Sequence, residues 1–200
     1  AGGMAVIGRS ASRARTCESV LVRQGAPTLA GIKPGSIFSF NRSPLEISRQ
    51  KVRQWDKRLA PLGLAVQILL ERPCSSWAIV YVYRRTHLER LLSGNACQRF
   101  LAKAGYAGTD LDGLLNQLAR RLQTQPEFPH EIGVFLGYPL RDVIGFIENR
   151  GRNFTCCGFW KSYGDPTEVE ARFACYRRCI HTYVNLYEQG TPIEKLAVSA

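Results

Sequence analysis

The chain has 200 residues and a mass of 22.4 kDa, which is enough for one domain with a hydrophobic core. Hydrophobic residues make up 45% and charged residues 22% of the chain, which excludes a wholly disordered protein, a collagen and a coiled coil. No segment approaches the roughly 20 consecutive apolar residues of a membrane span, so we expect no membrane partner.

The positive charge is concentrated towards the N-terminus. Lysine and arginine number 27 against 16 acidic residues, for a formal net charge of +11. Residues 1–60 hold 11 basic and 3 acidic side chains, whereas residues 131–200 hold 8 of each. Arginine suits phosphate and carboxylate, so an anionic ligand or a nucleic acid is one interpretation. A solvated basic surface is the simpler one.

Residues 1–24 show no sustained hydrophobic period and are predicted to form a loose basic arm. The segment 25–85 is predicted to be rich in strands. Its first strand-like run covers residues 36–40, and two further β-rich runs cover 64–70 and 77–83. The last two runs predict an antiparallel hairpin.

A basic helix is predicted between these strands. Ser43 is the expected N-cap, Pro44 the first helical residue, and the helix runs to Leu59 before Pro61 and Gly63 end it. Its outer face carries basic side chains at a spacing that suits phosphate contacts, namely Arg49, Arg53 and Lys57. A nucleic acid bound through residues 1–60 is therefore one hypothesis.

After residue 85 the apolar spacing becomes helical. Helices are predicted over 86–92, 96–104, 111–123, 129–136, 139–148 and 166–189. A long connection, 149–164, precedes the last of them. The predicted fold class is α+β, with a small antiparallel or mixed sheet packed against a mainly helical part, 86–200, in a single compact domain, 25–200.

Several short motifs are distinctive enough to indicate a family. They are Ala-Pro-Thr-Leu-Ala-Gly-Ile-Lys-Pro at 26–34, Pro129-His130-Glu131, Leu136-Gly137-Tyr138-Pro139, Gly145-Phe146-Ile147-Glu148 and Trp160-Lys161-Ser162-Tyr163-Gly164-Asp165. With these motifs the chain resembles, over nearly its whole length, the bacterial domain-of-unknown-function family 3793. The resemblance implies a cytoplasmic bacterial protein and names no reaction. It also implies a cysteine where this chain has Gly25, so thiol chemistry is lost at that position.

Seven cysteines at irregular spacing argue against a secreted disulfide framework and predict a cytoplasmic location. Their thiols are then free, redox-active or bound to a metal. Cys175 and Cys179 share one helix face, and with Cys157 and His130 they are candidate ligands of a transition metal. The alternative is that these are structural thiols in the core.

Basic and aromatic residues alternate in the connection 149–164. Arg150, Arg152, Trp160, Lys161 and Tyr163 could bind a planar or phosphate-bearing cofactor, and Tyr138 joins them as a candidate. The alternative is that the aromatic rings fill the core while the basic residues face water.

His130 and Glu131 are candidates for acid–base catalysis, because a neutral imidazole beside a carboxylate can move protons. The alternative is that both make local hydrogen bonds at a helix start.

These observations lead to three hypotheses about function. The first is an accessory, ligand-binding protein with a metal, thiol or cofactor site in its C-terminal half; nucleic-acid binding is second, and an enzyme using His130 and Glu131 is third.

Overall fold

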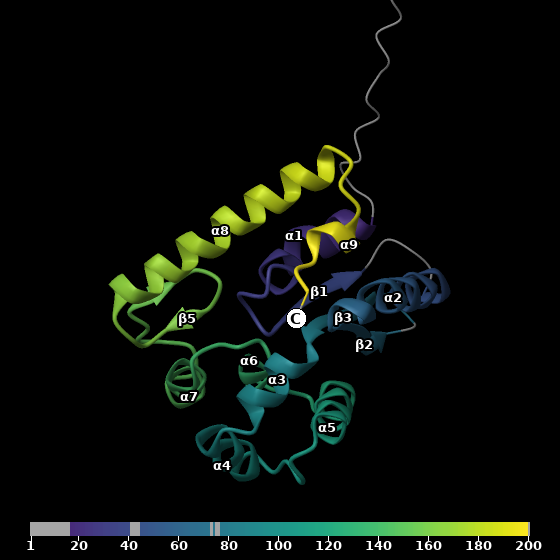
Figure 1. Ribbon diagram of the computed structural model, residues 1–200. Coiled ribbons are helices and arrows are strands. Elements are labelled where there is room, and N and C mark those ends of the chain that lie inside the picture. The colour runs from purple at the N-terminus through teal and green to yellow at the C-terminus, as the bar shows by residue number, and fades with distance from the viewer. Residues whose placement is uncertain (1–16, 41–44, 73, 75–76, 200) are drawn as a thin grey trace, which may run out of the picture.

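The computed structural model describes residues 17–40, 45–72, 74 and 77–199 (Figure 1). The predicted cap at Ser43 and Pro44 lies outside these residues, as do residues 1–16 of the predicted arm. The fold is α+β, as the sequence indicates, with a small antiparallel sheet in the N-terminal half and helices through the rest.

Three antiparallel strands form the main sheet. They are β1 (Gly35–Phe40), β2 (Leu64–Arg72) and β3 (Trp77–Arg84), and β3 lies in the centre. The β2–β3 hairpin confirms the prediction from the two β-rich runs. The pairing register shifts between Ile68 and Leu70, and Leu69 and Leu70 are both buried at this bulge.

The central strand is buried on both faces, so its alternating side chains enter two different hydrophobic clusters. Val80 and Val82 pack with residues of α1 (Cys17–Leu29), α2 (Leu45–Leu59), α9 (Ile193–Leu196) and the C-terminal half of α8 (Pro166–Glu188). The 3₁₀ turn η1 (Ala60–Leu62) joins α2 to β2.

The opposite face of β3 presents Ile79, Tyr81 and Tyr83 to a second cluster. This cluster is completed by α3 (Arg85–Leu92), α4 (Asn95–Lys103), α5 (Leu111–Thr124) and α6 (Ile132–Phe135). The predicted helices are thus present, although the predicted helix at 129–136 is shortened to α6.

A third, smaller cluster lies under the connection between α7 (Leu140–Glu148) and α8. A short hairpin, β4 (Cys156–Cys157) and β5 (Lys161–Ser162), covers the N-terminal half of α8 through Trp160 and Phe173. Residues 149–164 therefore contain a two-stranded element that the sequence pattern did not indicate. None of the helices within the described residues is long and apolar enough to cross a bilayer.

The helix α1 corrects the predicted boundary of the arm. It begins at Cys17, so residues 17–24 are helical, and Leu21 and Val22 are fully buried. Gly25 and Pro27 have poor helix propensity and made this segment resemble a loop. Packing of the α1 apolar face against α8 and the sheet outweighs that propensity.

A buried arginine joins α1 to the C-terminal segment. Arg84, only 1% exposed, donates to the carbonyl oxygens of Thr28, Leu29 and Val198 at 2.7, 2.5 and 2.7 Å. The first two carbonyls belong to the last turn of α1, where a cation is favourable, and each also accepts a backbone hydrogen bond, Thr28 from Gly31 and Leu29 from Val198.

Candidate functional site

A pocket of about 370 Å³ lies where β1, α6, α7 and the β4–β5 hairpin meet. This volume falls in the range of small-molecule sites, which are roughly 300–1,000 Å³. Most of the lining is apolar, with aromatic rings from Phe128, Tyr138, Phe146 and Trp160. The polar groups in the lining come from His130, Asp142, Cys157 and Lys161.

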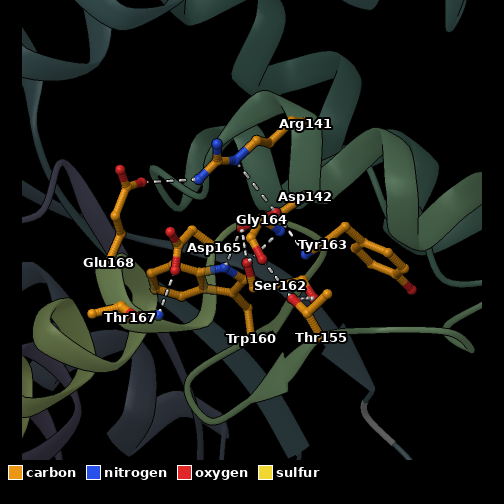
Figure 2. A network of polar contacts seen from close by, with 10 residues as sticks. All are labelled: Arg141, Asp142, Thr155, Trp160, Ser162, Tyr163, Gly164, Asp165, Thr167 and Glu168. Carbon is orange, nitrogen blue, oxygen red and sulfur yellow. Dashed lines mark hydrogen bonds and ion pairs between the residues drawn. The ribbon is translucent and has the colours of Figure 1, made fainter.

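The carboxylate of Asp142 fixes one wall of this pocket. It is buried, and it accepts hydrogen bonds from Trp160 Nε1 at 2.8 Å, Ser162 Oγ at 2.9 Å and the Tyr163 backbone N–H at 2.9 Å (Figure 2). All three donors belong to the β4–β5 hairpin and the residue after it, whereas Asp142 lies in the first turn of α7. This contact therefore holds the hairpin on α7 and orients the Trp160 indole.

Sequence reasoning missed Asp142. An acidic residue three positions after Pro139 is common in the first turn of a helix, where it faces the free backbone N–H groups. That local pattern does not indicate that the carboxylate instead binds residues of the β4–β5 hairpin, about 20 positions later in the chain.

Stacked aromatic rings continue the wall. The Trp160 ring stacks on Tyr138 with 4.9 Å between centroids and meets Phe173 edge-on at 4.6 Å. The Nζ atom of Lys33 lies 5.3 Å from the centroid of the Tyr138 ring. Lys33 is only 9% exposed, and its burial lowers the pKa of the ammonium group to about 8.

The loop that carries Lys33 packs against the pocket wall through a contact between Pro34 and Gly137. Gly137 has φ +74°, and a Cβ atom there would lie 2.4 Å from Pro34 Cγ. Only glycine satisfies both the left-handed backbone and this close approach. The α1–β1 loop and the α6–α7 loop are therefore held in direct contact beside Tyr138.

Lys161 and Cys157 occupy the hairpin side of the pocket. They are directly opposite each other in the β4–β5 register, and Cys157 is exposed. The Lys161 ammonium donates to the Gly151 carbonyl at 2.8 Å and lies 4.9 Å from the Phe154 ring centroid. One such bond leaves further N–H groups of the ammonium for a ligand.

Comparison with known proteins places the chain in one family. The sequence model of the family described as Protein of unknown function (DUF3793) matches residues 21–197. The chain belongs to the DUF3793 family. The family resemblance of its motifs is thereby confirmed over nearly the whole length. No curated protein and no solved structure shows significant similarity to this DUF3793 protein.

In this DUF3793 protein the pocket assembles five of the residues chosen from the sequence. They are His130, Tyr138, Cys157, Trp160 and Lys161. Trp160 and Tyr138 also belong to a small hydrophobic cluster, so the two interpretations of the aromatic residues are compatible: the rings fill a core and line a pocket.

Arg150, Arg152 and Tyr163 lie outside the lining of this pocket. The two arginines are exposed, and Arg150 has φ 50° in a tight turn. Tyr163 supports the loop, because its hydroxyl donates to the Arg152 carbonyl at 2.9 Å. These residues shape the connection 149–164 rather than the pocket surface.

His130 and Glu131 are adjacent in sequence but have different partners. The His130 ring packs against Phe146, with 4.9 Å between centroids. The Glu131 carboxylate accepts a hydrogen bond from Tyr106 at 3.1 Å and pairs with Arg121 at 3.2 Å. Both residues line a second pocket, of about 750 Å³, but there the Glu131 carboxylate is held in a partly buried ion pair with Arg121 instead of pairing with His130.

The four candidate metal ligands are not gathered at one place. His130 and Cys157 line the pocket, whereas Cys175 and Cys179 lie on α8 outside it. Among the residues that the structure describes, no three His, Cys, Asp or Glu side chains are grouped as a metal site. The seven cysteines all fall within the described part, and each is a free thiol.

The basic face of α2 is largely engaged in ion pairs. Arg49 pairs with Glu71 and Glu46, and Arg53 also pairs with Glu46. The Arg49 contact lowers the pKa of Glu71 through a direct hydrogen bond. Two of the three side chains expected to contact phosphates therefore already have acidic partners.

Proposed function

We propose that this DUF3793 protein is a cytoplasmic ligand-binding protein whose site is the aromatic pocket. The ligand is a small, flat, mainly apolar molecule that carries one anionic group. A single observation supports this most strongly: a pocket of about 370 Å³ lined by four aromatic side chains, with a lysine at one side.

The chemistry of the lining defines this class of ligand. Four aromatic rings line the pocket and Phe128 is exposed, so a planar molecule can pack against this lining. Lys161 supplies the positive charge for a carboxylate, sulfonate or phosphate. The free thiols suit a reducing compartment such as the cytoplasm.

The proposal is tested with an anionic aromatic probe, 1-anilinonaphthalene-8-sulfonate, titrated against the folded protein. We expect saturable binding to one site, and Lys161→Gln should weaken it by roughly threefold to tenfold because the charge pair is lost. Lys195→Gln is the matched control, since Lys195 is an exposed lysine of α9 outside the pocket. Equal loss of affinity in the two variants would contradict the proposal.

A second experiment looks for the natural ligand. Native mass spectrometry of the freshly purified, reduced protein should show an added mass that disappears on denaturation. A clean apo protein that also fails to bind the probe saturably would rule out a ligand of this class.

A further inference from the structure

A separate cleft of about 230 Å³ lies between α1 and α8, which run side by side in Figure 1. Its lining comes from one residue of α1, Arg23, and from one face of α8. The α8 residues are Arg177, Ile180, His181, Val184 and Asn185. They recur at three- and four-residue steps, which places them in a single stripe along the helix.

The polar lining of this cleft is suited to an anion. It contains two guanidinium groups, an imidazole and an amide, and no carboxylate. Arg23 and Arg177 are exposed, and neither forms an ion pair within the described part of the chain. An anion bound in this cleft would therefore meet two cations that have no acidic partner among the described residues.

The helices that carry these side chains, α1 and α8, pack against each other. Arg23 follows Leu21 and Val22, which are fully buried and hold α1 on the core. The Asn185 amide nitrogen lies 3.4 Å from His181 Nδ1 and 3.5 Å from His181 Nε2, so the amide and the imidazole are neighbours on α8. The donors on α1 and α8 therefore face one space from two fixed helices.

The size of the cleft limits the ligand. At about 230 Å³ it is smaller than the roughly 300 Å³ at which cofactor and drug-sized sites begin. Ile180 and Val184 add a small apolar surface beside the cationic groups. We propose that Arg23, Arg177 and His181 bind the phosphate group of a small phosphate monoester, with its organic part on Ile180 and Val184.

Binding is measured by isothermal titration of the full chain at low salt with phenyl phosphate and with inorganic phosphate. We expect saturable binding of both, tighter for phenyl phosphate. Arg177→Gln and Arg23→Gln should each weaken it at least about tenfold, because a bidentate charged contact is lost. Arg178→Gln is the matched control, since Arg178 is a neighbouring exposed arginine of α8 outside the cleft, and it should retain the parent affinity.

Two outcomes would overturn the proposal. One is the absence of saturable binding of either compound at millimolar concentration. The other is that Arg178→Gln weakens binding as much as Arg177→Gln, which would indicate a diffuse basic surface. A single-stranded oligonucleotide is titrated in parallel; tight binding that is insensitive to Arg177→Gln while phenyl phosphate fails would assign the charge to nucleic acid instead. Circular dichroism confirms that each variant is folded.

Discussion

Lys33 is a buried cation whose charge works against the stability of the fold. Its side chain is 9% exposed, and its ammonium group lies over the Tyr138 ring with no acidic partner in the described part of the chain. Burial lowers its pKa to about 8, whereas an ordinary lysine titrates at 10.5. Below pH 8 both the folded and unfolded states carry the proton, so the full cost of burying the charge is present there.

This cost predicts a stabilising substitution with a definite pH dependence. The unfolded state binds more protons than the folded state between pH 8 and 10.5, so the parent protein gains stability as pH rises through that window. Lys33→Met should therefore be more stable than the parent at pH 7, by about 1–3 kcal/mol, because each pKa unit corresponds to about 1.4 kcal/mol and the ring contact is lost. The difference should shrink towards pH 10.5.

Urea unfolding of both proteins across this pH range measures the effect. Lys195→Met, at an exposed lysine, should change the unfolding free energy little at any pH. A gain for Lys33→Met that does not depend on pH would contradict the charge argument.

At the scale of elements, α8 connects two parts of the core. Its C-terminal half contributes Tyr187 to the sheet cluster, and its N-terminal half contributes Phe173 to the cluster under the β4–β5 hairpin. The hairpin lies close to α8 at Gly158, where a Cβ atom would lie 2.4 Å from the Phe173 ring. The hairpin can pack this closely on α8 because residue 158 is a glycine and has no side chain.

A double-mutant cycle tests this fit. Gly158→Ala should destabilise the protein by about 1–3 kcal/mol, because the added methyl group overpacks the ring. In a Phe173→Leu background the added cost should be clearly smaller, since the ring that meets the methyl group is gone. Unfolding free energies of the four proteins give the coupling; strictly additive effects would show that Gly158 is needed for another reason.

At the scale of the whole molecule, Arg84 joins segments that are far apart in the sequence. It extends from the end of β3 to the last turn of α1 and to Val198, whose own N–H donates to the Leu29 carbonyl at 3.0 Å. The sheet, the first helix and the C-terminal segment therefore depend on one another. The single compact domain over residues 25–200 stays a prediction.

Replacing Arg84 should weaken the fold as a unit. Arg84→Met removes three hydrogen bonds from a charged donor that join β3 to α1 and to the C-terminal segment, and we expect a loss of at least about 3 kcal/mol in the free energy of unfolding. Arg85→Met is the control, because Arg85 is a surface residue whose ion pairs with Glu89 and Asp112 contribute no more than about 1 kcal/mol each. Similar losses in both variants, measured by urea unfolding, would contradict a central role for Arg84.

The sequence predicted the elements whose apolar pattern repeats, and missed what depends on distant contacts. The hairpin of β2 and β3 and the helix α8 follow from local periodicity. The helix α1 was missed because Gly25 and Pro27 outweigh a short apolar stripe. For the pocket, aromatic and basic composition indicated Trp160 and Lys161, but neither Asp142 nor Lys33 carries a local signal of burial.

Because Pro34 contacts Gly137, a ligand in the aromatic pocket would also change the stability of the main sheet. One pocket wall, Tyr138, follows Gly137, and another, Ile37, lies on β1 just beyond Pro34. A ligand that restricts the motion of Tyr138 and Ile37 therefore also stabilises β1, the first strand of the main sheet. Binding energy gained in the pocket is then shared by the cooperative unit as a whole, and the melting temperature becomes a direct reporter of ligand concentration.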